Sequence, residues 1–393
     1  MKNIKKTKIN IGVSGAGRTG GLAGYLAEED DICIYGVYDP DFGRAKTMLS
    51  NAGNPGGIVF KTYSDMIQCR EIDAVMVGSP NAYHKEQIIS AFAAGKHVFS
   101  EKPLAPTVAD CKAITDAHKK TNLLFATGFC MRYARLYQRA KEILDSGVLG
   151  KIISIDANEN INPGHGAMIM TNWRRYKEIA GPHILEKCCH DLDLLNWFTG
   201  SVPRRVCAFG GNNFFIPEHA HLLKKSQQFN RLKEYWDKDT DPFTSEKNIE
   251  DNLVAILEFY NGARAQFQAT MCNTIPERRM YMHCTEGNII TEQYSAVLRW
   301  RTLTDNEEHV EKMTEFHDAH LEGYQKVHAE GDRRIMSEFA QSLRTGAEPK
   351  CSGQEGMRSA AAAIAVDQAR IQNSVVDLGP VWEELGISRQ LIT

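Results

Sequence analysis

The first third of the chain alternates short apolar runs with longer amphipathic stretches. The apolar runs have the length of strands and are rich in β-branched residues, which favours buried strands. The expected strands are Ile9–Ser14, Ile32–Tyr38, Ala74–Gly78, His97–Ser100 and Leu123–Thr127. The expected helices between them are Leu22–Glu29, Gly43–Ala52, Tyr63–Gln68, Tyr83–Ala94 and Thr107–Lys119. This alternation predicts a doubly wound α/β domain with a parallel sheet over residues 1–128.

Beyond residue 128, apolar and polar residues alternate within longer runs. Such alternation predicts half-buried strands of an open, mainly antiparallel sheet, and residues 129–393 are therefore expected to form an α+β domain. The expected strands are Ile152–Asn160, Arg205–Gly210, Asn252–Tyr260, Arg264–Ala269 and Arg279–Cys284, with a hairpin turn at Asn261-Gly262. The expected helices are Tyr133–Ser146, Leu185–Phe198 and the alanine-rich stretch 356–372, which is expected to pack between the domains. The polar stretch 212–247 is expected to be a long, partly helical excursion.

Composition narrows the class of protein. The chain has 393 residues and a formal charge of −3, which gives no sign of nucleic acid or an anionic membrane as a partner. The basic start is not followed by a long apolar run, so it does not indicate a secretory signal, and no apolar run approaches membrane-spanning length. The ten cysteines contain no CxxC pair, which indicates a reducing cytoplasm.

A glycine motif, Gly15-Ala16-Gly17-Arg18-Thr19-Gly20, follows the first expected strand and opens the first expected helix. In that context the glycines permit a tight turn and let the backbone approach a pyrophosphate at the helix N-terminus. Asp39 ends the second strand, where a carboxylate accepts hydrogen bonds from ribose hydroxyls and repels a 2′-phosphate. This favours NAD over NADP, although Arg44 nearby can soften the preference. The alternative is a solvent-facing turn aspartate.

Two later loops also follow strands at the carboxyl edge of the expected parallel sheet. Ser79-Pro80-Asn81, together with His84, is either a ligand-facing loop or an ordinary turn that Asn81 caps. Glu101-Lys102-Pro103 places an ammonium group at the same edge. A lysine beside a bound nicotinamide suits proton transfer coupled to hydride transfer. The alternative is a surface lysine that pairs with Glu101.

Acid–base residues gather in the expected helix of the second domain. Glu186 and His190 are four residues apart and would share a helix face, and Asp193 follows three residues later, where it can orient the imidazole. This set suits general acid–base catalysis, metal binding or a salt-bridged helix face. The spacing of the histidines demands no metal, and none is expected.

In the loop Trp173-Arg174-Arg175, arginine can clamp an anionic group and the indole can stack on a sugar or a nicotinamide; the alternative is a loop that covers the domain junction.

Taken together, these stretches resemble the Gfo/Idh/MocA family, which includes glucose–fructose oxidoreductase and inositol dehydrogenase. The resemblance covers nearly the whole chain and rests on GVSGAGRTG, SPNAYHKEQIISAFAAGKHVFSEKP, GFCMRYARLYQRAKEILDSGVLGKI, NWRRYKEIAGP and HDLDLLNWFTG. It implies a Rossmann domain, a second domain with a large open sheet, and dimers or tetramers that pair through that sheet. It also implies NAD(P)-dependent oxidation or reduction of a secondary alcohol of a sugar, polyol or glycoside.

The resemblance assigns roles to individual positions. Lys102 and His190 match the catalytic lysine and histidine, whereas Glu186 stands where the family has aspartate and Cys188 where it has glycine. The expected cofactor contacts are Gly15, Gly17, Arg18, Thr19, Asp39, Ser79, Pro80, Asn81, His84, Glu101, Lys102, Trp173 and Arg174. The expected substrate contacts are Arg132, Tyr133, Glu186 and Asp193.

The leading hypothesis is a dehydrogenase in which His190 takes the hydroxyl proton, Lys102 stabilises the developing alkoxide and Glu186 positions a neighbouring hydroxyl. A first alternative is a redox-neutral glycoside hydrolase that oxidises C3 transiently with tightly held NAD, eliminates the aglycone and adds water. A second alternative is a dinucleotide-binding regulator without turnover, which the presence of both Lys102 and His190 disfavours.

Overall fold

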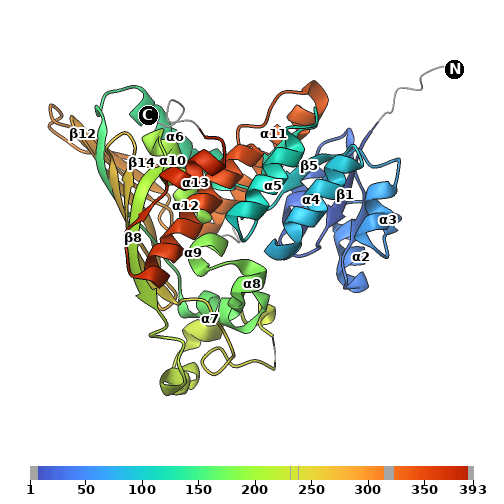
Figure 1. The fold of residues 1–393 in the computed structure, drawn as a ribbon, viewed down its shortest axis with the longest axis horizontal. Helices are drawn as coiled ribbons and strands as arrows, with labels where there is room; N and C mark the ends of the chain where they lie inside the picture. Colours follow the sequence, from blue (N-terminus) through green and yellow to red (C-terminus); the bar gives the residue numbers. More distant parts are fainter. Residues whose placement is uncertain (1–7, 231, 238, 314–322, 388–393) are drawn as a thin grey trace. The chain divides into compact units, whose positions relative to one another are not determined.

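The computed structural model describes residues 8–230, 232–237, 239–313 and 323–387. These residues form two compact units (Figure 1). Unit 1 contains the chain up to Ala105, the segment Ala109–Cys130 and the segment Gly331–Met357, and unit 2 contains the rest. The segment 331–357, which the expected division at residue 128 assigned to the second domain, therefore packs in unit 1.

Unit 1 is built on a six-stranded sheet in the order β3-β2-β1-β4-β5-β6. All neighbouring strands are parallel, which confirms the predicted doubly wound sheet. The strands are β1 (Ile9–Ser14), β2 (Ile32–Tyr38), β3 (Ile58–Val59), β4 (Ala74–Val77), β5 (His97–Ser100) and β6 (Phe125–Thr127). The strand order reverses between β1 and β4, and a crevice for ligands is expected at the carboxyl ends of these two strands.

The helices of unit 1 follow the predicted stretches closely. They are α1 (Thr19–Leu26), α2 (Phe42–Asn51), α3 (Tyr63–Gln68), η1 (Asn81–Tyr83), α4 (His84–Ala93) and α5 (Val108–His118). Helix α1 begins three residues earlier than expected, directly within the glycine motif. This places the helix N-terminus against the loop that the motif forms.

Two long helices, α11 (Gly323–Thr345) and α12 (Gly353–Gln372), pass from one unit to the other along the sequence. Helix α12 confirms the predicted alanine-rich helix, whereas α11 was not predicted. In the unit 1 part of α11, Phe339 packs on Phe99 of β5 with ring centroids 5.5 Å apart. Neither these helices nor any other in the described part of the chain is long and apolar enough to cross a membrane.

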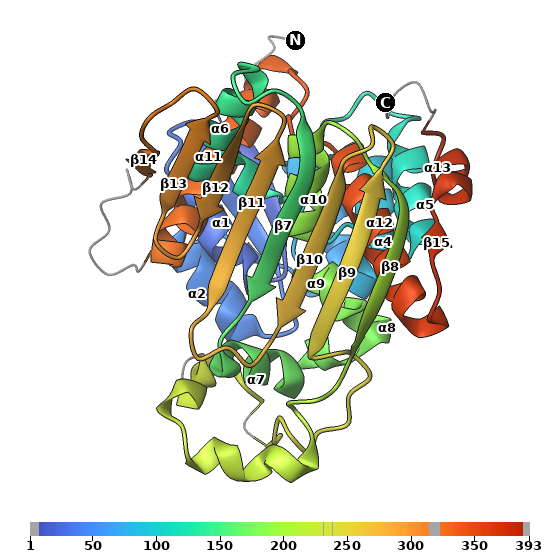
Figure 2. The ribbon, with the colours of Figure 1, turned by 90° about the vertical axis from the view of Figure 1, so that its left-hand side faces the viewer.

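Unit 2 is built on a nine-stranded sheet in the order β14-β13-β12-β11-β7-β10-β9-β8-β15 (Figure 2). Its strands are β7 (Ile152–Asn160), β8 (Pro203–Gly211), β9 (Asn252–Phe259), β10 (Arg264–Thr270), β11 (Glu277–Cys284), β12 (Gly287–Glu292), β13 (Val297–Thr302), β14 (His309–Lys312) and β15 (Val376–Asp377). The sheet is mainly antiparallel, as predicted, but β10 pairs with β7 in parallel. Buried and accessible residues alternate along β9 and β11, so one face of the sheet is covered and the other is open.

The prediction of one continuous helix over Leu185–Phe198 is wrong. The segment forms two helices, α9 (His183–Glu186) and α10 (Cys189–Thr199). Cys188 has φ −93° and ψ 5° and serves as the N-cap of α10, where its carbonyl accepts the N–H groups of Asp191 and Leu192. Glu186 and His190 therefore lie on two helices and do not share one helix face. The helix predicted from Tyr133 likewise divides into η2 (Cys130–Tyr133) and α6 (Arg135–Asp145).

The excursion at 212–247 forms a small core of its own with helix α7 (Pro163–Thr171). Its described part contains the 3₁₀ turns η4 (Pro217–Lys224), η5 (Gln227–Asn230) and η6 (Lys233–Tyr235). Phe243 packs against Phe215 and Phe229, with ring centroids 5.2 and 5.7 Å apart. The Asp251 carboxylate accepts the backbone N–H groups of residues 213 to 215 and so anchors the start of the excursion.

Candidate active site

The glycine loop of unit 1 has the geometry of a dinucleotide cradle. Gly15 has φ +88°, and a Cβ there would lie 2.5 Å from the Gly78 carbonyl oxygen, so only glycine fits between β1 and β4. A Cβ at Gly17 would meet nothing within 4 Å, which leaves its backbone open to a ligand. The Thr19 hydroxyl donates to the Gly15 carbonyl and fixes the turn. The loop thus presents backbone N–H groups at the start of α1, as binding of a pyrophosphate requires.

A cavity of about 540 Å³ adjoins this loop. Its lining comes from the glycine loop, the start of α1 and the whole length of α2, namely Ala16, Gly17, Gly20, Gly21, Asp41, Gly43, Arg44, Thr47, Met48 and Asn51. The volume and the glycine-rich wall fit the adenosine and pyrophosphate part of a dinucleotide.

Asp39 is buried beside this cavity and is not the solvent-facing turn residue of the alternative hypothesis. Its two carboxylate oxygens accept the Ala16 N–H at 2.7 Å and the Asp41 N–H at 2.8 Å. The carboxylate therefore joins the glycine loop to the entry of α2. The exposed Arg44 guanidinium lies 3.4 Å from the same carboxylate and lines the cavity.

The loops after β4 and β5 are joined by His84. Its Nδ1 lies 3.0 Å from the Pro103 carbonyl oxygen and its Nε2 lies 2.9 Å from the Ser79 carbonyl oxygen. Burial lowers the pKa of His84, although both carbonyl contacts favour the protonated ring. Pro80 and the buried Asn81 form the start of η1 in the same loop. His84 thus holds the Ser79-Pro80-Asn81 loop against the loop of Lys102.

Glu101 and Arg18 belong to an ion cluster in unit 1. The Arg18 guanidinium pairs with Asp332 and has its Nε 3.8 Å from a Glu101 oxygen. Burial raises the pKa of Glu101, and the charges of Arg18 and Lys102 oppose that shift. The Lys102 backbone N–H donates to the Glu101 carboxylate at 3.2 Å, at the carboxyl end of β5. Two predicted cofactor residues, Arg18 and Glu101, are therefore close to each other, and Asp332 is a partner that the sequence did not suggest.

In unit 2, His190 lies in the first turn of α10 and is buried. Its ring is 5.9 Å from that of His328, edge to face. Asp193, one turn further along α10, receives a bidentate pair from Arg132, with both N–O distances 2.6 Å. Tyr133 is buried next to Arg132 at the end of η2. The structure therefore brings together Arg132 and Asp193, two of the predicted substrate residues.

Arg174 and Glu186 form a second pair. Asn172 caps the short turn η3 (Trp173–Arg175) by accepting the Arg174 N–H. The Arg174 guanidinium lies 4.3 Å from the Trp173 ring centroid and its Nε donates to Glu186 at 2.7 Å. Arg174, which was predicted to contact the cofactor, thus contacts the predicted substrate residue Glu186.

Several charged residues around this pair were not predicted. Burial lowers the pKa of His165 on α7 well below its usual value, and Lys187 and Arg174 add to the shift. Glu159, Lys187, Asp191 and Arg278 form further buried ion pairs. The burial of Arg278 could have been predicted from the sequence, because the alternation along β11 places this arginine on the covered face of the sheet. The predicted strand began one residue too late to include it.

The comparisons with known proteins place the chain in a family. Residues 9–129 match the model of the Gfo/Idh/MocA oxidoreductase family, NAD-binding Rossmann fold, and residues 141–378 match the model of its C-terminal alpha/beta domain. The chain belongs to this family of oxidoreductases.

The chain is also similar to individual proteins. The chain is 32% identical over 212 residues to an uncharacterized oxidoreductase of Streptococcus pneumoniae, a match that spans 54% of this chain and 56% of the relative. It is 28% identical to the 2,7-anhydro-N-acetylneuraminate hydratase of Escherichia coli over 72% of this chain and 67% of that protein. It is 25% identical to the myo-inositol 2-dehydrogenase of Thermotoga maritima over 88% of this chain and 92% of that protein. A levoglucosan dehydrogenase solved with NADH and levoglucosan has the same fold, with a TM-score of 0.78, 19% identity, and coverage of 95% of this chain and 100% of that one.

Proposed function

We propose that this protein is an NAD-dependent dehydrogenase that transfers hydride between the nicotinamide and a secondary hydroxyl of a sugar or cyclic polyol. The observation that carries the proposal is the glycine cradle with its adjoining cavity, on a chain that also retains Lys102 and His190. The inositol and levoglucosan dehydrogenases among the similar proteins support a neutral, hydroxyl-rich substrate.

The roles of the side chains follow from their chemistry. Bound NAD supplies the hydride acceptor. His190 takes the hydroxyl proton as a general base, and the Lys102 ammonium stabilises the negative charge that develops on the same oxygen. Glu186, held by Arg174, accepts a hydrogen bond from a neighbouring hydroxyl of the substrate. Arg132 holds Asp193 for a similar contact.

A second candidate function is supported by the hydratase relatives. The Escherichia coli and Mediterraneibacter gnavus proteins are both named 2,7-anhydro-N-acetylneuraminate hydratase. A redox-neutral reaction of this class would use NAD for a transient oxidation, followed by elimination, addition of water and reduction. The same His190 and Lys102 would serve the two hydride transfers. The regulator without turnover has no comparable support.

One experiment separates these candidates. The purified protein is incubated with NAD and a panel of inositols, free sugars, anhydrosugars and aryl glycosides, and NADH and the organic products are followed in the same wells. NADH that accumulates in step with substrate oxidation supports the dehydrogenase. Conversion of an anhydrosugar or glycoside without net NADH supports the redox-neutral reaction, and the absence of any conversion across the panel contradicts both.

We further propose NAD rather than NADP as the cofactor, because the buried Asp39 carboxylate beside the cavity repels a 2′-phosphate. The exposed Arg44 makes NADP the weaker alternative. All ten cysteines are free thiols, which supports a reducing cytoplasm as the location of the protein.

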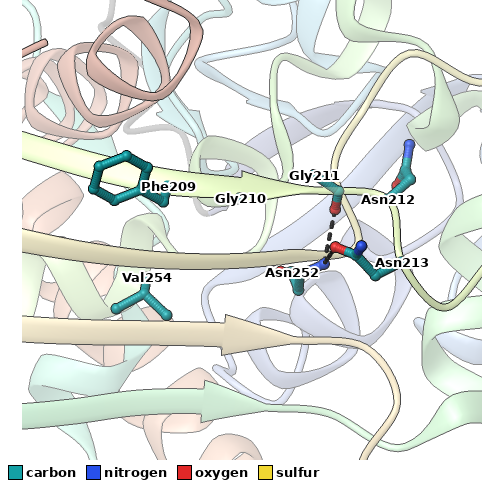
Figure 3. Close-up of a pocket in the computed structure, with 7 residues that line it drawn as sticks. All are labelled: Phe209, Gly210, Gly211, Asn212, Asn213, Asn252 and Val254. Atoms are coloured by element: carbon teal, nitrogen blue, oxygen red, sulfur yellow. Dashed lines mark hydrogen bonds between the residues drawn. The ribbon is translucent and has the colours of Figure 1, made fainter. Parts of the chain in front are cut away.

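We also propose a homodimer or homotetramer that pairs through the open face of the unit 2 sheet. The apolar side chains of Phe209, Val254, Ile256 and Val310 are exposed there by 69%, 44%, 54% and 59%. Figure 3 shows Phe209 and Val254 on neighbouring strands. Together with Asn252, they line a pocket of about 480 Å³. Exposed apolar side chains that gather on one sheet face are typical of a contact between protein subunits.

A further inference from the structure

Four charged side chains form a buried cluster on the covered side of the unit 2 sheet. Glu159 on β7 and Arg278 on β11 are cross-strand partners, Lys187 lies between α9 and α10, and Asp191 directly follows His190. The side chains of Glu159, Arg278 and Asp191 are exposed by 5%, 4% and 0%, and that of Lys187 by 18%. Charges buried this deeply require partners, and their pairing is therefore informative.

Two carboxylate oxygens compete for one hydrogen in this cluster. The Arg278 Nε lies 2.8 Å from Asp191 Oδ1 and also 2.8 Å from Glu159 Oε2. Its single hydrogen is directed at Asp191, and Arg278 Nη2 donates to the other Asp191 oxygen at 2.9 Å. Lys187 Nζ lies 3.2 Å from Glu159 Oε1. Within the described residues, Glu159 Oε2 is thus buried without a hydrogen bond from any N–H or O–H donor.

Because one oxygen of each carboxyl group lies 2.8 Å from the same Arg278 Nε, Glu159 and Asp191 are direct neighbours in the cluster. Two ionised carboxylates in contact inside a protein repel each other, whereas one proton between them makes a hydrogen bond and satisfies the remaining oxygen. We propose that Glu159 and Asp191 share one proton at neutral pH, so that the pair carries a single negative charge between Arg278 and Lys187.

Burial and the charge of Glu159 favour a proton on Asp191, and the charge of Arg278 opposes it. Burial raises the pKa of Asp191 to about 8, against the effect of Arg278 and with the help of Glu159. For Glu159, Arg278 and Lys187 outweigh burial and lower the pKa. The other titratable groups that face the cluster are Tyr137 on α6, His165 on α7, His183 on α9 and the Cys188 thiol. Because the two carboxyls interact strongly, they titrate as one unit, which loses its shared proton on the alkaline side.

The consequence for catalysis rests on the proposed function. The cluster ties the first turn of α10, which carries His190, to β7 and β11. Loss of the shared proton leaves two carboxylates in contact, and their repulsion displaces Asp191 and with it the turn of His190. Glu159 and Asp191 are therefore positioning residues for His190, and turnover is expected to fall severalfold as the pair titrates.

The shared proton can be detected without any substrate. In D₂O, infrared difference spectra of the full chain against Asp191→Asn and against Glu159→Gln are expected to show a carboxylic-acid carbonyl band at neutral pH. The band should disappear at alkaline pH and should be lost in each variant, because one remaining carboxyl ionises against Arg278. Asp156→Asn is the matched control, since Asp156 also lies on β7 but is 39% exposed and pairs with Arg279. This variant should retain the band.

A wild-type spectrum without the band at neutral pH, or a band that persists in both Asp191→Asn and Glu159→Gln, would overturn the proposal. Lys187→Met provides a second measurement if either amide variant folds poorly. Removal of this cation from Glu159 makes proton loss harder, so the band should persist to a more alkaline pH than in the wild type. An unchanged or lower midpoint would also contradict the shared proton. Failure to find any substrate would contradict the proposed function and leave these spectra unaffected.

The positioning role has its own readout. Wild-type kcat/KM is expected to decline at alkaline pH with the midpoint of the infrared band, whereas Asp191→Asn, which cannot acquire the second charge, should lack that decline. Identical alkaline limbs in the two proteins would overturn the positioning role.

Discussion

At the residue scale, the predicted substrate residues of unit 2 are held in ion pairs with arginine. The Arg132 guanidinium donates two hydrogen bonds to Asp193, and Arg174 donates one to Glu186. These charge-assisted hydrogen bonds fix the position of each acid. An arginine-held acid suits a neutral polyol, because the charges are already balanced before the substrate binds.

His190→Ala and Lys102→Ala are each expected to lower kcat by about 10²- to 10⁴-fold, the usual contribution of a positioned acid or base. The dissociation constant for NADH, measured by fluorescence titration, should stay the same. His221→Ala and Lys120→Ala are controls, because both residues are exposed and His221 lies in the excursion. Near-normal turnover in both site variants would show that other residues move the proton.

Arg44→Glu is expected to lower kcat/KM for NADP by about tenfold or more, because it removes the cation that can face a 2′-phosphate and adds a repulsive charge. The value for NAD should change little, since Asp39 keeps its two backbone contacts. Lys46→Glu on the same helix is the charge-matched control, because Lys46 does not line the cavity. Equal losses for both cofactors would instead indicate that Arg44 supports the fold of the loop.

At the scale of elements, two glycines of the motif have different expected roles: Gly15 supports the fold and Gly17 supports cofactor binding. Gly15→Ala is expected to destabilise unit 1 by about 1–3 kcal/mol, because Gly15 has φ +88° and its Cβ would collide with the backbone of Gly78. Gly17→Ala should leave the melting temperature unchanged, since its Cβ meets nothing, but should weaken NADH binding at the loop. Thermal melts with and without NADH test both. The opposite ranking of the two variants would contradict the assignment of the loop.

Helix α9 carries a histidine whose titration affects stability. Burial lowers the pKa of His183 to about 4. The unfolded chain therefore binds a proton that the folded chain rejects, and stability from this site is complete above about pH 6.5 and is lost as pH falls toward 4. The loss amounts to about 3 kcal/mol.

His183→Gln should flatten the acid side of the curve of unfolding free energy against pH, measured by denaturant titration. His221→Gln, at an exposed position, serves as its control. An acid limb that is equally steep in His183→Gln and in the wild type would assign the loss to other groups.

At the scale of the whole molecule, the open sheet predicts the state of assembly. Ile256→Lys is expected to shift the protein toward the monomer, because it places a charge among the exposed apolar side chains of the sheet face. Ile371→Lys on α12 is the control, since Ile371 is exposed to a similar extent outside that face. Light scattering after size-exclusion chromatography gives the mass of each species. A wild-type protein that is already monomeric would contradict the proposed pairing.

Much of the architecture follows from the pattern of the chain. Parallel strands that are covered on both faces require continuous apolar runs, as in the fully buried β4, and an open sheet requires alternation, as in β9. The glycine motif was readable because its context, a strand followed by a helix, is local. These features depend on residues that are close in sequence, and the burial of each kind of element produces its own apolar pattern.

The tertiary structure decided the features that depend on distant residues. Only the folded chain shows that Asp191 and Glu159 both pair with Arg278, that β10 runs parallel to β7, and that the segment 331–357 packs in unit 1. The tertiary structure also interrupts the predicted helix 185–198 at Lys187, whose ammonium lies beside Glu159. Local periodicity predicts which face of an element is buried. It cannot predict which buried charges will face one another, because those pairs are set by how strands and helices from separate parts of the chain pack.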